Sequence, residues 1–338
     1  MTTLTMGRAL NRGLHRALAD DPKVLVMGED IGQLGGVYRI TDGLQAEFGS
    51  DRVIDTPLAE SAIVGTAIGL AIRGYRPVCE IQFDGFVYPA FDQIVAQLAR
   101  MHSRTNGAMK LPITIRIPVG GGIGAAEHHS DSPEAYFAHT PGLRVVSVAT
   151  PQDAHTMLRQ AIASDDPVIF FEPKRRYHVK GEVDENTELA TAPPLGRSRV
   201  LTVGDDVTVV TFGSLVPTAL DAAIVAADEG VSVEVIDLRS LAPLDLEPVE
   251  ASVRRTGRLV IAHEAARSGG LGAEIAAAVT ERCFNYLESA PVRVTGHDIP
   301  YPPAKLEKHH VPDLDRILFG IDRVLGRAPV EQSAVEQR

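Results

Sequence analysis

The feature that most constrains the fold of this chain is a regular alternation of short β-rich runs with helical patterns. In the first half of the chain, we predict strands at 23–27, 78–83, 112–119, 143–148 and 167–172. Helical patterns lie near 60–73, 89–104 and 152–164. Such alternation is typical of a mainly parallel sheet that is covered by helices on both faces. We therefore predict an α/β fold.

The alternation is interrupted once, by the segment GEVDENTELATAPPLGRS at 181–198. This segment is polar, contains a double proline and has no periodicity, which indicates a linker. The alternation then resumes and ends with a helix near 313–326. We therefore predict a first domain over 1–180, a smaller α/β domain over 199–327 and a disordered tail over 328–338. An amphipathic helix capped by Thr5 is expected near the N-terminus.

The composition, net charge and cysteine count exclude several classes of protein. The chain of 338 residues is 44% hydrophobic and 23% charged, which is typical of soluble globular proteins. Its net charge is −11 without a basic block, so neither nucleic acid nor an anionic membrane is an expected partner. Two cysteines in no metal-like spacing indicate a reducing compartment. No stretch resembles a signal peptide or a membrane span, so the expected location is the cytoplasm.

One carboxylate, Glu60, stands between a Thr-Pro turn and a long run of small and apolar residues, DTPLAESAIVGTAIGLAI. One interpretation is a carboxylate in the first turn of a helix, where the helix dipole stabilises it by about 0.3–1 kcal/mol. The other is a buried carboxyl with a raised pKa, which could share a proton with a ligand nitrogen. The residues alone leave both open.

Two further stretches are candidates for ligand binding. Glu29 directly follows the strand at 23–27, and α/β sheets bind ligands at the carboxyl ends of their strands. The alternative is a solvated loop acid. The stretch EIQFDGFVYPAFDQI at 80–94 concentrates aromatic residues near Gln82, including Phe83 and Phe86. These side chains form either ordinary core or an apolar wall for a flat heterocycle.

A third stretch, VGGGIGAAEHHSDSPEAYFAH at 119–139, combines glycines with histidines. Its glycines formally satisfy a dinucleotide fingerprint, G-x-G-x-x-A, but the sequence shows no helix start after them and no acid at the end of a second strand. A flexible loop that presents histidines fits better, with a surface loop as the alternative. Histidine is suited to proton transfer near neutral pH, and at most one of His128 and His129 is expected to point into a site.

Taken together, these stretches resemble one family. GED, DTPLAES, EIQFDGFVYPAFDQIV, HHSDSPEAYFAHTPGLRVV, DPVIFFEPK, EVIDLRSLAPLD and TGRLVIAHEA occur in the order found in beta subunits of thiamine-diphosphate-dependent 2-oxoacid dehydrogenases. These subunits belong to the decarboxylating component of the pyruvate and branched-chain complexes. The resemblance covers about residues 4 to 326. It implies a pyrimidine-binding domain with the thiamine-diphosphate-binding fold, followed by a transketolase C-terminal domain.

The resemblance also implies roles for individual residues. Glu60 matches the glutamate that hydrogen-bonds the aminopyrimidine ring of thiamine diphosphate, and His129 matches the histidine that assists acyl transfer to a lipoyl group. Four positions match the surroundings of the pyrimidine ring: Glu29, Leu58, Gln82 and Phe86. Some members bind a structural monovalent cation such as K+ through carbonyls that match Ile113, Ala161, Ile162, Ser164 and Asp166. Those members have Asp and Asn where this chain has Ser164 and Asp166.

The family pattern further implies partners. The GDG motif with a following Asn, which holds Mg2+ on the diphosphate in one-chain thiamine enzymes, does not occur in the 338 residues. The resemblance therefore implies an alpha subunit that supplies this half of the site in an α2β2 assembly, and a lipoyl transacylase that receives the acyl group. SPEAYFAH and FFEPK favour a branched-chain 2-oxoacid as substrate, with pyruvate as the alternative. Two other classes stay open: a nucleotide-dependent oxidoreductase and a catalytically silent subunit.

Overall fold

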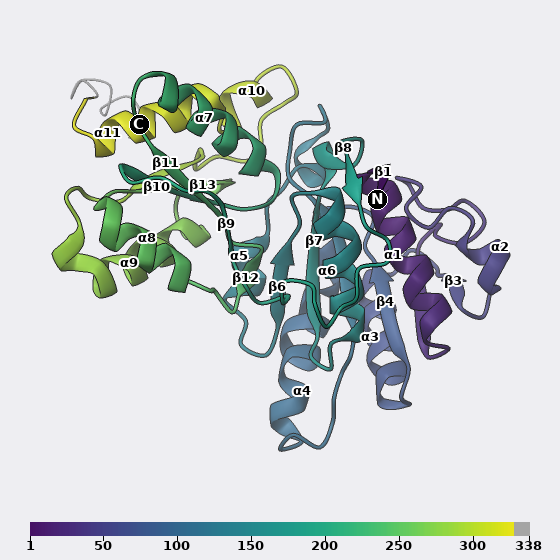
Figure 1. Ribbon diagram of the computed structural model, residues 1–338. Coiled ribbons are helices and arrows are strands. Elements are labelled where there is room, and N and C mark those ends of the chain that lie inside the picture. The colour runs from purple at the N-terminus through teal and green to yellow at the C-terminus, as the bar shows by residue number, and fades with distance from the viewer. Residues whose placement is uncertain (328–338) are drawn as a thin grey trace. The chain divides into compact units, whose positions relative to one another are not determined.

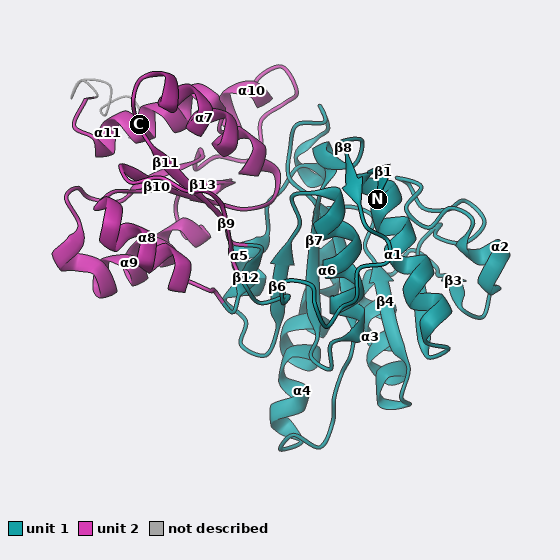
Figure 2. Ribbon diagram, viewed as in Figure 1, with its two compact units in different colours: residues 1–197, 239–243 teal, residues 198–238, 244–338 magenta. Residues whose placement is uncertain are grey.

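The chain folds into two compact units in the computed structural model, which describes residues 1–327 (Figures 1 and 2). Unit 1 comprises residues 1–197 and 239–243, and unit 2 comprises residues 198–238 and the chain from 244 onward. The tail predicted at 328–338 lies outside the described residues. The linker predicted at 181–198 belongs to unit 1 apart from Ser198 and carries most of a strand, β8 (Lys180–Val183).

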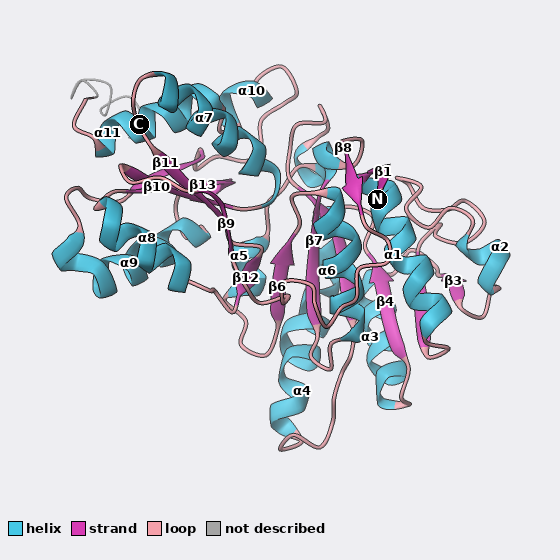
Figure 3. Cartoon of the chain, in the orientation of Figure 1, coloured by secondary structure: helices cyan, strands magenta, loops and turns pink. Residues whose placement is uncertain are grey.

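Unit 1 is built on a seven-stranded sheet (Figure 3). In spatial order its strands are β12 (Ser240–Ala242), β6 (Arg144–Ser147), β7 (Val168–Pro173), β5 (Thr114–Val119), β4 (Arg76–Glu80), β2 (Val24–Gly28) and β3 (Val53–Asp55). All neighbouring strands are parallel except β12, which is antiparallel to β6. Every residue of β2, β5 and β7 is buried, as expected for strands covered on both faces. The predicted α/β fold with a mainly parallel sheet is confirmed.

Helices and a small second sheet complete unit 1. Its α-helices are α1 (Met6–Asp20), α2 (Leu44–Phe48), α3 (Glu60–Ile72), α4 (Ala99–Arg104), α5 (Glu134–Ala138) and α6 (Pro151–Ala163). The predicted helix at 89–104 is instead a 3₁₀ turn η1 (Asp84–Ala90), a π-helix η2 (Gln93–Leu98) and α4. Two short 3₁₀ turns are η3 (Glu127–His129) and η4 (Lys174–Arg176), and β1 (Thr2–Thr5) pairs with β8.

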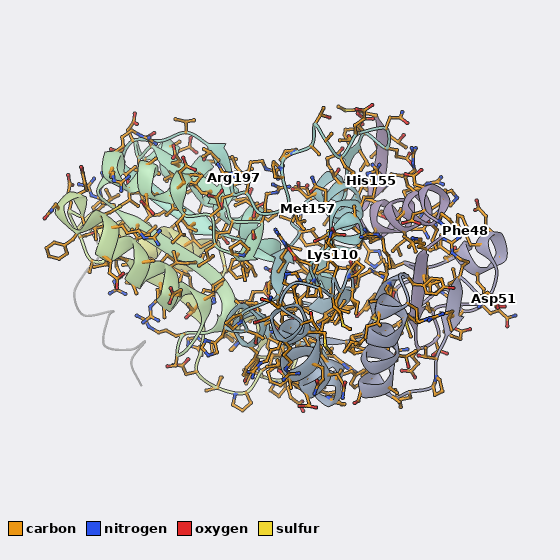
Figure 4. All side chains as sticks on the ribbon, turned by 90° about the horizontal axis from the view of Figure 1, so that it is seen from below. Phe48, Asp51, Lys110, His155, Met157 and Arg197 are labelled. Atoms are coloured by element: carbon orange, nitrogen blue, oxygen red, sulfur yellow. The ribbon has the colours of Figure 1, made fainter. Side chains whose placement is uncertain are left out.

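Helices α1 and α6 pack against each other on one face of the sheet, around a core that includes Met6, Leu10 and Met157. The predicted cap is present, because the Thr5 hydroxyl accepts a hydrogen bond from the Arg8 amide at 3.2 Å. The two helices approach closely at Gly13, where an added Cβ would lie 3.1 Å from the His155 carbonyl oxygen. His155 and Met157 are labelled in the interior of unit 1 in Figure 4.

Unit 2 contains a five-stranded sheet with its own core. In spatial order its strands are β14 (Val292–Gly296), β13 (Leu259–Ala266), β10 (Val207–Thr211), β11 (Val233–Asp237) and the antiparallel edge strand β9 (Arg199–Thr202). Its helices are α7 (Val216–Asp228), α8 (Glu247–Thr256), α9 (Leu271–Cys283), α10 (Glu307–His310) and α11 (Leu314–Val324), with 3₁₀ turns η5 (Gly213–Leu215) and η6 (Phe284–Tyr286). Helices α7 and α11 pack on one face, and α8 and α9 on the other (Figure 1).

The predicted second domain, 199–327, is not continuous in the structure. Residues 239–243 return to unit 1, where β12 extends its sheet beside β6. The Arg239 side chain is buried there, and its guanidinium lies 3.4 Å from the Asp153 carboxylate. Three residues are too few to carry a strand signal, so only the tertiary pairing shows where this segment belongs.

Three neighbouring strands carry a buried charge cluster. The guanidinium of Arg116 on β5 donates two hydrogen bonds to Glu172 on β7, at 2.7 and 2.9 Å, and one to Glu80 on β4 at 2.6 Å. The Tyr177 hydroxyl donates to Glu172 at 2.8 Å. Burial raises the pKa of Glu80, while the Arg116 charge opposes that rise. Side chains of opposite charge are placed in this core only because the guanidinium satisfies both carboxylates.

Candidate active site

The sequence-predicted site residues follow four adjacent parallel strands. Strands β3, β2, β4 and β5 are neighbours in that order, and their carboxyl ends lie at one edge of the sheet. The first residue of α3, Glu60, comes after β3, and Glu29 comes directly after β2. Gln82 and Phe86 follow β4, and His129 follows β5. From β2 the chain passes to β3 on one side of it, and then returns through α3 to β4 on its other side. The strand order therefore reverses between β2 and β4. Open α/β sheets bind ligands at such a switch point.

Two carboxylates lie at this edge. Glu29 is half-buried, and its pKa is raised first by burial and then by the negative charges of Asp30 and Glu60. The Glu60 charge contributes to the raised pKa of Glu29, so the two carboxylates lie near one another. The Gln82 side chain is held at the same edge, because its Nε2 donates to the Glu29 backbone carbonyl at 3.3 Å. The carboxylates are hydrogen-bond acceptors, and an amide has a second N–H as well as an oxygen.

Glu60 lies in the first turn of α3, as both interpretations of the sequence require. Its side chain is only partly buried, and the neighbouring Leu58 is 67% exposed. Within residues 1–327, Glu60 is a first-turn carboxylate that is only partly enclosed. An enclosed Glu60 would require a further polypeptide or a ligand over this edge.

The glycine loop after β5 presents its histidines on the 3₁₀ turn η3 and not on a strand. Gly120, Gly122 and Gly124 have φ values of 80°, 88° and 70°, a conformation that favours glycine. No helix opens after them: the next element within the described chain is the three-residue turn η3. The dinucleotide alternative therefore lacks the helix N-terminus that binds the pyrophosphate.

His129 packs among aromatic side chains. Its ring centroid lies 3.9 Å from that of Phe83 at a tilt of 30°, and 5.2 Å from that of Phe86 in an edge-on arrangement. Burial lowers the pKa of His129, while the His128 carbonyl contact opposes this. The imidazole is therefore neutral near pH 7 and able to accept a proton. His128 is exposed, whereas His129 is partly buried among the aromatic side chains.

Two charged residues beneath this loop were not predicted from the sequence. Asp84 begins the 3₁₀ turn η1, and Lys174 directly follows β7. Their side chains form an ion pair with no exposed surface on either partner. The signal for Asp84 was its position in an aromatic stretch, where an acid requires a partner. Its partner stands 90 residues further along the chain and could not be inferred locally.

The carbonyls proposed as cation ligands lie close to the Arg76 guanidinium, which stands at the start of β4. Its Nη1 donates to the Ile162 carbonyl at 3.2 Å and to the Ser164 carbonyl at 3.0 Å. Its Nη2 donates to the Asp165 carboxylate at 3.0 Å. A positively charged group of the chain itself thus occupies the position between these oxygens.

Two of the other three proposed carbonyls also accept hydrogen bonds. The Ala161 carbonyl accepts from the Ser164 amide at 3.1 Å, and the Ile113 carbonyl accepts from the Val168 amide at 2.9 Å. At Asp166 it is the side-chain carboxylate that accepts, from Arg144 Nε at 2.8 Å. Four of the five proposed carbonyls therefore already have donors, and two of them face the positive charge of Arg76. We therefore do not propose a K+ site at these residues.

The Arg76 arrangement predicts how stability responds to salt and to substitution. Replacing Na+ with K+ at constant ionic strength is expected to leave the thermal unfolding midpoint of the chain unchanged. Arg76→Met is expected to lower the free energy of unfolding by about 1–3 kcal/mol, because the partly buried carbonyls lose their hydrogen-bond donor. Differential scanning fluorimetry in matched NaCl and KCl series measures both. A K+-specific rise in the midpoint of the unsubstituted chain would show that a cation site is present.

Family models assign both units to one class of protein. The pyrimidine-binding domain of transketolase matches residues 2–180, and the C-terminal domain of transketolase matches residues 196–317. A solved structure described as the inactive beta4 tetramer of a split-gene transketolase superposes with a TM-score of 0.77 at 25% identity, covering 96% of this chain and 99% of that one. The chain thus has the two domains of a transketolase-like protein.

Curated relatives narrow the class to a family. The chain is 60% identical to the pyruvate dehydrogenase E1 component subunit beta of Leifsonia xyli, over 96% of this chain and 95% of that protein. It is 56% identical to the 3-methyl-2-oxobutanoate dehydrogenase subunit beta of Mycobacterium tuberculosis, over 96% and 92%. The 2-oxoisovalerate dehydrogenase subunit beta of Pseudomonas aeruginosa is 44% identical, over 96% of each. The chain belongs to the family of E1 beta subunits of 2-oxoacid dehydrogenases.

Proposed function

We propose that this chain is the beta subunit of a branched-chain 2-oxoacid dehydrogenase that acts only together with an alpha subunit. The assembled enzyme would decarboxylate a 2-oxoacid with thiamine diphosphate and pass the acyl group to the lipoyl group of a transacylase. The observation that carries the proposal is the convergence of Glu29, Glu60, Gln82 and His129 at one edge of the sheet. These residues follow four different strands, and each matches a position that acts in the family.

The residues at this edge fit the aminopyrimidine end of thiamine diphosphate. An aminopyrimidine presents ring nitrogens and an exocyclic amine on a flat ring. Glu60 and Glu29 offer carboxylates, one of them with a raised pKa, and Gln82 offers an amide. Phe86 offers an aromatic surface and stands half-buried beside His129. Thiamine diphosphate supplies the carbanion chemistry when bound, while the protein orients it and places protons.

The diphosphate end of the cofactor needs a metal ion or backbone donors. Within residues 1–327, no group of three His, Cys, Asp or Glu side chains is placed to hold a metal ion. A diphosphate requires such an ion or a concentration of backbone donors. We propose that an alpha subunit holds Mg2+ and the diphosphate, and that it covers the exposed Leu58 and the partly buried Glu60. The description of the split-gene transketolase beta4 tetramer as inactive supports this division.

In the proposed assembly, the residues of this chain have distinct tasks. Glu60 holds a proton against the pyrimidine, in surroundings that the second subunit completes. Leu58 lies beside the same ring, and Glu29 supports it from the neighbouring strand. The neutral His129 accepts or returns a proton during acyl transfer to the lipoyl group, from its position against Phe83 and Phe86.

A branched-chain 2-oxoacid is the proposed substrate because SPEAYFAH and FFEPK resemble branched-chain members, and a relative at 56% identity carries that name. Pyruvate is the second candidate, because the relative at 60% identity is named for it. Part of the acyl site would come from the alpha subunit, so neither name transfers directly to this chain.

The decisive experiment begins with purification through a tag on this chain from its native cells. Native mass spectrometry is expected to show an equimolar partner of similar size that carries GDG and Asn. The complex should then turn over 2-oxoisovalerate faster than pyruvate, with lipoyl acceptor present. Faster turnover of pyruvate would replace the proposed substrate by the second candidate. A homodimer without such a partner would contradict the proposed division of the thiamine site.

Membrane insertion plays no part in the proposal. Among residues 1–327, the structure contains no helix that is both long and apolar enough to cross a lipid bilayer.

A further inference from the structure

A buried carboxylate, that of Asp84, joins the loop that carries His129 to the body of unit 1. One oxygen of Asp84 accepts a hydrogen bond from the Asp131 backbone amide, two residues beyond His129. The other oxygen of Asp84 accepts from the Lys174 ammonium. Both side chains of this ion pair are fully buried, so the loop is anchored to a fixed point and not to a mobile surface group.

Other contacts fix the same end of the loop. The Gly120 amide donates to the Asp131 carbonyl at 2.8 Å, which joins the two ends of the loop. The Tyr88 hydroxyl lies 3.3 Å from the Asp131 carboxylate. At Gly85, an added Cβ would lie 2.4 Å from the His128 carbonyl oxygen, so the turn η1 packs directly against the loop backbone. Asp84 therefore lies at the centre of the contact between η1 and the loop.

The ion pair connects the loop to the end of a fully buried strand that is paired on both sides. Lys174 directly follows β7, in the middle of the parallel sheet, and its ammonium lies 3.5 Å from the Pro118 carbonyl on β5. Lys174 also contributes to the low pKa of His129, after the effects of burial and of the neighbouring His128. The ion pair thus links the backbone next to His129 to the centre of the sheet.

We propose that Asp84, held in place by Lys174, is a positioning residue that orients the loop for acyl transfer by His129. The role in acyl transfer rests on the proposed function, whereas the orientation of the loop does not. Neither side chain has exposed surface through which it could contact a ligand in the described residues. The pair acts through the Asp131 amide and not by contact with a ligand.

The test separates the hydrogen bond to the loop from the charge of the pair. The double variant D84N/K174M removes both charges, which avoids a buried unpaired ion, but the asparagine oxygen can still accept from the Asp131 amide. The double variant D84L/K174M removes the same charges and also the acceptor. Comparison of these two variants isolates the anchoring of the loop. Y88F is a milder third variant, because it deletes one hydroxyl from a residue that is 41% exposed.

The first readout is the rate at which diethylpyrocarbonate modifies His129 relative to the exposed His128, measured by mass spectrometry on the full chain. The ratio is expected to stay below one in the unsubstituted chain and in D84N/K174M, and to rise towards one in D84L/K174M. Y88F is expected to shift it in the same direction by less. Circular dichroism verifies folding. If D84L/K174M does not fold, Y88F decides, and an unchanged ratio in the folded variants overturns the proposal.

The second readout is made on the assembled enzyme with its alpha subunit. D84L/K174M is expected to slow acylation of the lipoyl domain by about 100-fold, as for a misplaced catalytic group, with a much smaller loss in decarboxylation measured with an artificial electron acceptor. Equal losses in both steps would contradict a role specific to His129. If the modification ratio changes as expected but the unsubstituted enzyme acylates no lipoyl domain, the loop anchor stands and the proposed function fails.

Discussion

Glu60→Gln is expected to reduce decarboxylation by the assembled enzyme by about 10²–10⁴-fold, the usual contribution of a positioned proton-transfer group. Glutamine has the same length and can still hydrogen-bond, but it cannot hold a negative charge or share a proton. The fold should be unaffected, because Glu60 is only partly buried at the start of α3. Initial rates with an artificial electron acceptor, together with thermal unfolding, measure the two effects separately.

Glu47→Gln provides the matched control, because Glu47 also lies in the first turn of a helix of unit 1. Both substitutions remove a carboxylate charge from a first turn, where it contributes about 0.3–1 kcal/mol, and Glu47→Gln also removes the charge that lies 2.8 Å from His15 Nε2. If the helix terminus were the whole role of Glu60, both variants would keep full activity. Full activity of the Glu60 variant would reject the proton role and favour a catalytically silent subunit.

Arg116→Met is expected to destabilise unit 1 by about 3–5 kcal/mol, because it leaves two buried carboxylates without their cation. Glu172 and Glu80 both lose hydrogen bonds to the guanidinium, and methionine cannot replace them. Deprived of the cation, these carboxyls hold protons more strongly in the folded state than in the unfolded state. The stability of the variant should therefore fall as pH rises from about 5 to 8. Urea unfolding at both pH values measures this.

Lys110→Met is the control for a lost ion pair at the surface. The Lys110 ammonium lies 2.6 Å from Asp165, with 64% of the lysine side chain exposed, and Figure 4 labels the residue. Loss of this ion pair is expected to lower the free energy of unfolding by less than about 1 kcal/mol at any pH. If the Arg116 variant lost no more unfolding free energy than the Lys110 variant, the buried cluster would contribute little to stability.

The parts of the fold that could be predicted are those with a strong local pattern. Strand β5 was expected because its run of apolar and β-branched residues cannot stay in water, and all six of its residues are buried. Helix α1 was expected from its amphipathic period and the Thr5 cap. Short segments gave no such signal, so β1, β8, β9 and β12 were not predicted. Their backbone groups are paired by strands distant in sequence.

The residues of the candidate site also fall into two groups: those that the sequence could indicate and those that only tertiary contacts reveal. Glu29, Glu60 and His129 could be identified because each stands where its residue type is unusual: an acid at a strand end, an acid beside an apolar helix, a histidine after a glycine loop. The Asp84–Lys174 pair and the guanidinium of Arg76 among the proposed cation ligands could not, because both depend on contacts across the sheet.

The sequence by itself determined the α/β class, the order of the main strands and helices, and which residue types were available for chemistry. These follow from hydrophobic periodicity and from local resemblance, which act over a few neighbouring residues. The tertiary structure alone decided that Glu60 lies near enough to Glu29 to raise its pKa, that β12 lies in unit 1, and that Arg76 binds two of the carbonyls proposed as cation ligands. The physical reason is that burial and charge pairing depend on distances between side chains, and parallel strands bring together residues that are far apart along the chain.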